Sequence, residues 1–286
     1  MSTLKLLSPA KINLHLSILG KRSDGYHDLF MLMEKISFWD TLILEKIPKG
    51  IEIANPLPGV PPEKDLTYRA ATALQKVAAL FCHGVRITTT KNIPMGGGLG
   101  GGSGNAATVL KGLNQLWDLK LSKSDLIKIG KGLGADVPFF LEEGPCWVEG
   151  IGEKLKKISN LPKLYMILVH PGCSVETPWA YQEWDSRRLT EPIQGASLPA
   201  PEELKEIKGI EDILAILKND FEAVVLPKFP QIGETKRILK KLGAKKSLMS
   251  GSGASVFGIF ENVEGRDRAL KAFPQVEGWR IWPVNN

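Results

Sequence analysis

The chain is 286 residues long, and its 43% hydrophobic and 24% charged residues are proportions typical of a globular enzyme with buried cores. The net charge of +6 and the isoelectric point near 9.1 leave two classes of partner open, a nucleic acid and an anionic small molecule. The apolar runs are shorter than the roughly 18 residues of a membrane helix, so no membrane span is expected. Strand-like sequence begins too early for a leader segment to be expected. Three scattered cysteines predict reduced thiols and a cytoplasmic protein.

The first predicted element is a strand from Pro9 to Gly20, because apolar and polar residues alternate along it. This period predicts a half-buried strand whose polar face carries Lys11, Asn13 and His15. The next predicted elements are a turn at 22–25, strands at 36–45, 50–54 and 85–90, and a helix that begins near Asp65.

A glycine-rich segment at 94–107 lies between the last of these strands and a helix-forming run at 106–116, and seven of its fourteen residues are glycine. Glycine adopts positive φ and leaves the backbone bare, so consecutive amides that lead into a helix N-terminus can bind a phosphate. The sequence lacks the Gly-Lys-Ser/Thr of a P-loop, and a Gly-x-Gly-x-x-Gly match at Gly96, Gly98 and Gly101 is expected by chance in such a run. The alternative is a flexible hinge, but the Pro-Met and Leu at fixed places favour a phosphate-binding loop.

A capping box at 122–125 predicts a helix that continues to about residue 132. Asp136 follows, directly before Val137 and Pro138, and the proline predicts an extended backbone at Val137. A carboxylate beside so many apolar residues is expected to be partly desolvated unless it is paired.

An exposed connection is indicated by Lys154, Lys156 and Lys157, and it predicts a boundary between an N-terminal domain, 1–155, and a C-terminal domain, 156–286.

A basic run at 236–246 falls on a predicted helix with its own apolar stripe, so we interpret it as a solvated helix face rather than a nucleic-acid surface. The other predicted elements are strands at 147–150, 164–170, 256–260 and 279–284, helices at 202–208, 210–218, 231–242 and 264–273, a helix that begins at Thr177-Pro178, and a small-residue loop at 250–255.

Short motifs along the whole chain resemble those of one enzyme family. Pro9-Ala10-Lys11, the glycine run from Pro94 to Ser103, and Ser250–Ala254 occur in the order that is typical of the GHMP small-molecule kinases. The resemblance implies an α+β fold in two domains, with the active site in the cleft between them. The N-terminal domain is expected to be similar to a ribosomal-protein domain and the C-terminal domain to be ferredoxin-like.

Two further motifs, Asp24-Gly25-Tyr26-His27 and Leu133–Phe139, make the chain most similar to members of the family that act on a cytidyl compound. This resemblance implies ATP-dependent phosphorylation of the 2-hydroxyl of a cytidine-diphosphate-linked methylerythritol, with Mg²⁺ as cofactor, in the non-mevalonate route to isoprenoids. The expected partners are these small molecules, with neither nucleic acid nor membrane, and the protein is expected to be a monomer or homodimer. The alternatives are another kinase of the family, acting on mevalonate, homoserine or a sugar, and a basic nucleic-acid-binding protein.

The resemblance also implies roles for individual residues. Asp136 is expected to be the general base, and Lys11 to keep it ionised and to neutralise charge as the phosphoryl group moves. The sequence does not identify the magnesium ligands, because no pair of carboxylates in it stands out as a metal site. The expected substrate contacts are Asn13, Tyr26, His27, Thr177 and Tyr181, with cytosine between Tyr26 and Tyr181. The expected ATP contacts are Asp65 beside the adenine and, along the loop, Pro94, Met95, Gly96, Gly97, Gly98, Leu99, Gly100, Gly101, Gly102, Ser103 and Gly104.

Two of these residues depart from the family pattern. Gly104 stands where a second serine is usual, which leaves Ser103 as the only hydroxyl at the end of the loop. Asp65 stands where asparagine is expected; a carboxylate can accept a hydrogen bond from the amino group of adenine but lacks the donor of an amide.

Overall fold

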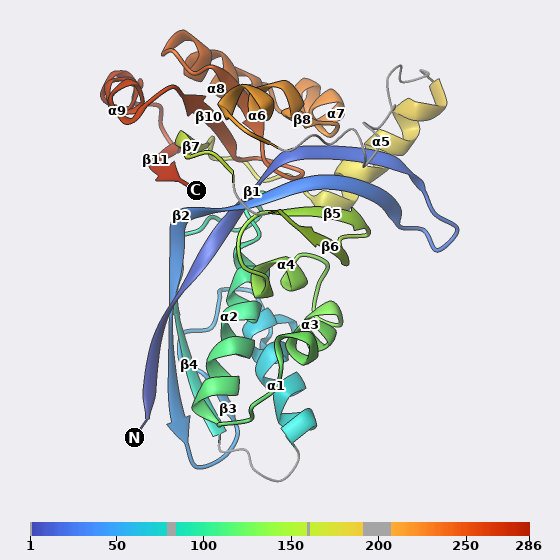
Figure 1. Ribbon diagram of the computed structural model, residues 1–286, viewed down its shortest axis with the longest axis vertical. Coiled ribbons are helices and arrows are strands. Elements are labelled where there is room, and N and C mark those ends of the chain that lie inside the picture. The colour runs from blue at the N-terminus through green and yellow to red at the C-terminus, as the bar shows by residue number, and fades with distance from the viewer. Residues whose placement is uncertain (1, 79–83, 159–160, 191–206) are drawn as a thin grey trace. The chain divides into compact units, whose positions relative to one another are not determined.

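The computed structural model describes residues 2–78, 84–158, 161–190 and 207–286, and the chain packs into two compact units (Figure 1). Two long strands, β1 (Thr3–Lys21) and β2 (His27–Ile47), contribute residues to both units. Unit 1 consists of Met1–Ala10, Phe38–Ile93 and Gly100–Glu143, and unit 2 consists of Lys11–Ser37, Pro94–Leu99 and Gly144–Asn286.

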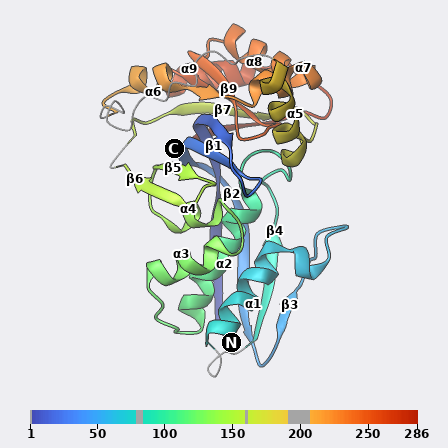
Figure 2. The same ribbon diagram turned by 90° about the vertical axis from the view of Figure 1, so that its right-hand side faces the viewer.

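Unit 1 is a sheet with helices on one face (Figures 1 and 2). Its strands lie in the order β3-β4-β2-β1, and β2 pairs with β4 in antiparallel register, Leu44 opposite Ile87. Helix α2 approaches this sheet closely at Gly112, where an added Cβ would lie 2.5 Å from the side chains of Leu6 and Leu44. The other elements of unit 1 are β3 (Ile51–Ile53), η1 (Pro62–Lys64), α1 (Leu66–Ala78), β4 (Gly84–Thr90), α2 (Gly101–Leu116), α3 (Lys123–Lys131) and α4 (Val137–Leu141).

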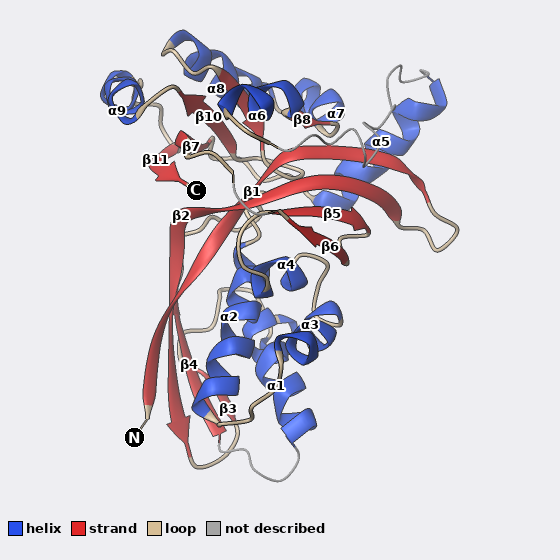
Figure 3. Cartoon of the chain, in the orientation of Figure 1, coloured by secondary structure: helices blue, strands red, loops and turns tan. Residues whose placement is uncertain are grey.

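Unit 2 contains a four-stranded antiparallel sheet in the order β11-β7-β10-β9. Figure 3 draws the strands red and labels β7, β10 and β11. Counted along the chain this order is 4-1-3-2, with helices in both crossovers, which is the split β-α-β arrangement of ferredoxin-like folds. Every residue of β10 is buried. The sheet consists of β7 (Tyr165–His170), β9 (Lys246–Met249), β10 (Val256–Phe260) and β11 (Arg280–Asn285), and α8 (Pro230–Lys241) and α9 (Val263–Ala272) pack on it.

The remaining elements of unit 2 surround its parts of β1 and β2. Strand β8 pairs with β1 in parallel, and β5 pairs with both β2 and β6 in antiparallel register. These elements are β5 (Cys146–Gly150), β6 (Lys154–Lys157), α5 (Thr177–Thr190), α6 (Ile210–Ile216), β8 (Lys218–Asn219) and α7 (Glu222–Lys228). The structure thus has the mixed α and β content expected from the sequence, and none of its described helices is both long and apolar enough to pass through a bilayer.

The prediction of a half-buried first strand is wrong, because the polar face of β1 is buried as well. Asn13 is fully buried, and Lys11 and His15 are each 5% exposed. Residues far along the chain provide hydrogen-bond partners for this part of the strand. The Nδ1 atom of His15 lies 2.7 Å from the carbonyl oxygen of Ile216, and the backbone amide of Ile18 donates to the Asp220 carboxylate at 2.9 Å. Alternation along a strand therefore indicates its two faces but does not show that the polar one is solvated.

Two local expectations are also wrong. Val137 is helical rather than extended, because Pro138 occupies the second position of α4, where the helix needs no backbone N–H. The three lysines of the segment Lys154–Lys157 are exposed, as expected, but the segment is a paired strand, β6, and not a connection. The domain boundary at 155/156 stays a prediction.

Most of the other elements are found close to where the sequence predicts them, and the capping box at Ser122 is present. Strands β1 and β2 begin earlier than expected, at Thr3 and His27 rather than at residues 9 and 36. Helix α2 begins five residues earlier than expected, at Gly101. Strands β8 and β9 and helix α7 were not predicted, and most of the helix expected at 202–208 lies outside the described residues.

The basic run at 236–246 makes local contacts, in agreement with its interpretation as a helix face. Lys236 pairs with Glu222, and Arg237 pairs with Glu234 one turn before it. The ammonium of Lys246 donates to two backbone carbonyl groups, at 2.8 and 2.9 Å. The two glutamates reduce the positive charge that the run offers to a nucleic acid.

Glu34 is a buried acid in unit 2 and makes the stability of the fold depend on pH. Its residue is 6% exposed, and burial raises the pKa of Glu34 from 4.5 to about 7. The folded state then binds this proton more tightly than the unfolded state, so stability is lost as the pH rises from about 4.5 to about 7.

We expect Glu34→Gln to increase the free energy of unfolding at about pH 8 by roughly 2–3 kcal/mol, because an amide needs no proton to stay neutral. The gain should disappear toward about pH 4.5. Urea unfolding at a series of pH values measures it, with the exposed Glu277→Gln as control. An equal effect of Glu34→Gln at all pH values would contradict the assignment.

Candidate active site

The glycine loop, defined here as residues 94–104, has the backbone that its sequence predicts. Gly96, Gly98 and Gly100 have φ of 65°, 72° and 66°, a region that favours glycine. Positive φ at every second residue is a feature of anion-binding nests, in which successive amides turn to one side. Gly100 is the N-cap of α2, so the loop leads directly into the helix, whose first amides have no intrahelical acceptor.

Carbonyl groups of the loop are held within unit 2. The oxygen of Leu99 accepts from the amide of Lys11 at 2.9 Å, and that of Gly98 accepts from the Ser250 hydroxyl at 2.9 Å. An added Cβ on Gly98 would lie 2.0 Å from the carbonyl oxygen of Ser250. The loop at 250–255, predicted separately, therefore packs directly on the glycine loop.

Lys11 and Asn13 share one face of β1, as the alternation predicts. The Lys11 ammonium donates to the side-chain oxygen of Asn13, and both residues are buried. The amide of Asn13 donates to the Ser250 hydroxyl at 3.3 Å, and its side-chain nitrogen lies 3.3 Å from the sulfur of Met31. Burial and these contacts hold the Lys11 side chain against Asn13, while the backbone amide of Lys11 binds the loop residue Leu99.

Asp136 lies at the N-terminus of α4 in unit 1 and is half-buried. Helix α4 packs against α2. An added Cβ on Gly134 would lie 3.9 Å from the Ser103 hydroxyl. Unit 1 thus places Gly134, two residues before the candidate base Asp136, beside the serine at the end of the glycine loop.

The structure explains why Gly104 departs from the family pattern. An added Cβ would lie 2.8 Å from the carbonyl oxygen of Pro9 and 3.1 Å from the hydroxyl of Ser8. The backbone oxygen cannot yield as a flexible side chain could, so β1 and α2 approach too closely here for a serine. Ser103 remains the hydroxyl at this end of the loop.

Asp65 stabilises the start of α1. Its Oδ1 atom accepts from the amide of Thr67 at 2.7 Å and from the Thr67 hydroxyl at 2.6 Å. This is the geometry of a helix N-cap. A contact between Asp65 and adenine stays a prediction, and one of its carboxylate oxygens is already engaged in capping.

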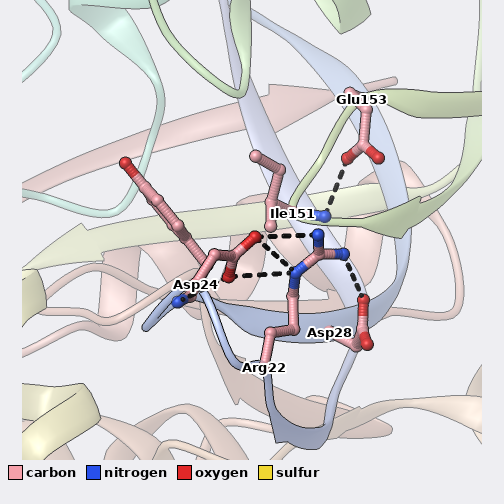
Figure 4. A network of polar contacts seen from close by, with 6 residues as sticks. Arg22, Asp24, Asp28, Ile151 and Glu153 are labelled. Atoms are coloured by element: carbon pink, nitrogen blue, oxygen red, sulfur yellow. Dashed lines mark hydrogen bonds and ion pairs between the residues drawn. The ribbon is translucent and has the colours of Figure 1, made fainter.

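Tyr26 lies in a hydrogen-bonded turn between β1 and β2, and the residue is 61% exposed. Figure 4 shows the contacts of Arg22 with Asp24 and Asp28 in this turn. Arg22 donates to Asp24 with Nε at 3.0 Å and Nη2 at 2.8 Å, and to Asp28 with Nη1 at 3.0 Å. Asp24 in turn accepts from the amide of Tyr26 at 3.1 Å, and these donors lower the pKa of Asp24, the Arg22 side chain most of all. The turn thus presents an exposed aromatic ring on a backbone that the hydrogen bonds of Arg22 and Asp24 hold in place.

His27 and Tyr181 also come together, although in an arrangement that the sequence does not predict. Their rings stack with centroids 4.5 Å apart and planes 17° apart, so no base fits between these two. The Nε2 atom of His27 lies 2.7 Å from a carboxylate oxygen of Asp185, which also pairs with Lys21 at 2.6 Å. Because a carboxylate only accepts, Nε2 carries the proton and a neutral His27 ring leaves Nδ1 as an acceptor.

Two partners of the predicted residues were missed. Asp185 follows Tyr181 by four residues on α5, and this helical spacing could have found it. The hydroxyl of Thr177 lies 2.7 Å from that of Ser252 in the loop at 250–255, a contact that no sequence spacing signals.

Comparisons with known proteins agree with these observations. Two family models match, that of the GHMP kinases N terminal domain at residues 65–144 and that of the GHMP kinases C terminal at residues 200–276. The chain is 41% identical to a 4-diphosphocytidyl-2-C-methyl-D-erythritol kinase of Citrifermentans bemidjiense, over 98% of this chain and 97% of that protein. It is 43% identical to the protein of the same name from Syntrophus aciditrophicus, over 99% of each.

Solved structures show the same relationship. A crystal structure of 4-(cytidine 5'-diphospho)-2C-methyl-D-erythritol kinase is 34% identical and matches with a TM-score of 0.81, over 99% of this chain and 98% of that one. Homoserine kinase from Cytophaga hutchinsonii, 19% identical with a TM-score of 0.69 over 100% of this chain and 95% of that one, shares the fold. With both domain models matched and close relatives along its whole length, the chain belongs to the GHMP kinase family.

Proposed function

We propose that this chain transfers the γ-phosphoryl group of ATP to the 2-hydroxyl of 4-diphosphocytidyl-2-C-methyl-D-erythritol, in the cytoplasm, as a step of isoprenoid synthesis. The observation that carries the proposal is the 41–43% identity, over nearly the full length, to relatives that bear the name of this kinase. Relatives with other substrates, such as homoserine kinase, are similar at the level of the fold.

The glycine loop would bind the phosphates of ATP. Its carbonyl oxygens at Gly98 and Leu99 are occupied by protein donors, which removes negative ends of the peptide dipoles from the site. The amides that open α2 supply partial positive charge at the same place. A triphosphate fits this distribution of charge.

The chemical step needs a base, an alcohol and stabilisation of the charge that moves. Asp136 would take the proton of the 2-hydroxyl as its oxygen attacks the γ-phosphorus and ADP leaves. Lys11, buried and oriented by Asn13, would neutralise the transferred group.

Mg²⁺ would contribute charge neutralisation at the phosphates. The described residues contain no cluster of three His, Cys, Asp or Glu side chains that could hold a metal ion. The Ser103 hydroxyl lies at the C-terminal end of the glycine loop and would contribute one oxygen ligand to the ion.

The cytidyl group would bind on the exposed ring of Tyr26. The adjacent His27 is fixed by Asp185, and its acceptor Nδ1 matches the amino group of cytosine, whereas uracil has an oxygen there. Tyr181 supports the His27 ring by stacking and supplies part of the surface.

We expect Tyr26→Ala to raise KM for the cytidyl substrate by about 10-fold or more, because stacking on an aromatic ring contributes about 1–3 kcal/mol per base. KM for ATP should change little. Steady-state kinetics with each substrate varied in turn measures both. Tyr26→Phe, which keeps the ring, is the matched control, and equal changes in the two KM values for Tyr26→Ala would make Tyr26 a structural residue.

Phosphorus NMR of the purified chain with ATP, Mg²⁺ and the cytidyl substrate tests the function directly. The expected result is ADP together with a new phosphomonoester signal. A panel with mevalonate, homoserine and galactose distinguishes other kinases of the family. Preferential turnover of one of these compounds would overturn the proposal.

A further inference from the structure

A buried carboxylate in unit 1 has no place in the chemistry described above. Asp40 on β2 is fully buried, although its neighbour Trp39 is 41% exposed. It belongs to none of the sequence motifs. A buried acid needs donors to offset its desolvation, and the identity of those donors shows what this one holds together.

One oxygen of Asp40 holds the backbone that leads into the glycine loop. Its Oδ1 atom accepts from the amide of Asn92 at 2.8 Å and from that of Ile93 at 2.9 Å. The side chain of Asn92 donates in turn to the carbonyl oxygen of Trp39 at 2.9 Å, so the segment is tied to β2 at three points. The loop begins at the next residue, Pro94.

The other oxygen of Asp40 holds the helix into which the loop leads. Oδ2 accepts from the side-chain nitrogen of Asn105, on α2, at 3.0 Å, and also pairs with the ammonium of Lys91. An added Cβ on Gly101 would lie 3.2 Å from that ammonium, so Lys91 sits at the positive end of the α2 dipole. Asp40 supplies the negative charge that makes this position of Lys91 tolerable.

We propose that Asp40 is a positioning residue for phosphate binding, because a single carboxylate fastens both ends of the glycine loop. The proposal rests on the proposed function in that the loop is taken to bind ATP. Between the fastened Ile93 and the start of α2 at Gly101 lie seven residues, 94–100, and four of them are glycine, which has the largest conformational entropy to lose. Fixed ends reduce the entropy that the loop must lose when it binds a nucleotide.

The test compares Asp40→Asn with Asp125→Asn, which weakens the capping box of α3 in the same unit by replacing the carboxylate that accepts from Ser122. Asp40→Asn should raise KM for ATP and the Kd of ADP about 10- to 100-fold, with KM for the cytidyl substrate unchanged. Amide hydrogen exchange at 96–102 in the nucleotide-free protein should accelerate in Asp40→Asn alone. Asp125→Asn should lower the melting temperature and leave both KM values as in the wild type.

The proposal is overturned if Asp40→Asn lowers the melting temperature as Asp125→Asn does but keeps the wild-type KM for ATP and the wild-type exchange of the loop. If Asp40→Asn does not fold, Asn105→Ala removes one of the four donors and should raise KM for ATP in the same sense by a smaller factor. An unchanged KM in that variant also overturns the proposal. A wild-type protein that does not bind ADP would instead refute the proposed function.

Discussion

Asp136→Asn is expected to lower kcat by about 10²–10⁴-fold while KM for ATP stays at its wild-type value. The amide has the shape of the carboxylate, so the first turn of α4 is preserved. It cannot accept the proton of the attacking hydroxyl, however, and the alcohol must then react without a base. ADP release followed by a coupled assay measures kcat, and nucleotide binding is measured separately by calorimetry.

The control for this variant is Asp118→Asn, a change of the same chemistry at an exposed carboxylate of unit 1. Asparagine tolerates the positive φ of 52° at that position. Its turnover should equal that of the wild type. If Asp136→Asn retained more than roughly a tenth of the wild-type kcat, Asp136 would not be the general base.

Gly98→Ala is expected to destabilise the protein by roughly 2–5 kcal/mol, the sum of about 1–2 for a non-glycine residue at positive φ and about 1–3 for overpacking. The added Cβ would lie 2.0 Å from the carbonyl oxygen of Ser250, and a backbone atom cannot move aside without a shift of the whole loop at 250–255. Because the glycine loop would shift too, KM for ATP should also rise. Urea unfolding and steady-state kinetics measure the two effects.

Gly59→Ala separates the two causes. Gly59 has the same φ of 72° as Gly98, but no described atom lies within 4 Å of its added Cβ. It should therefore show the cost of the backbone conformation alone, about 1–2 kcal/mol, with normal KM values. Equal losses of stability in the two variants would mean that the contact with Ser250 contributes nothing.

Features set by local chemistry could be predicted from the sequence. The period of β1 placed Lys11 and Asn13 on one face, and the glycine run indicated positive φ where Gly96, Gly98 and Gly100 have it. The capping box at Ser122 was also found. Each of these depends on residues within a few positions of one another, and that is the range over which spacing carries information.

Features set by distant residues could not be predicted. The polar face of β1 is buried because its partner Ile216 lies 201 residues further along the chain. Asp40 is 52 residues from Asn92 and 65 from Asn105, so its role is invisible before the chain is folded. The error at Val137 has another origin: a proline disfavours a helical residue before it but does not exclude one, and here Pro138 lies in the first turn of α4, which packs on α2.

The pairing of β1 with β8 also has a consequence for synthesis. At about 5–20 residues per second, the ribosome makes the 201 residues that separate His15 from Ile216 in roughly 10–40 s. During that time the nascent chain carries His15 and Ser17 without the partners that will bury them. Until then this part of unit 2 cannot complete its packing, and the strand is open to a chaperone throughout that time.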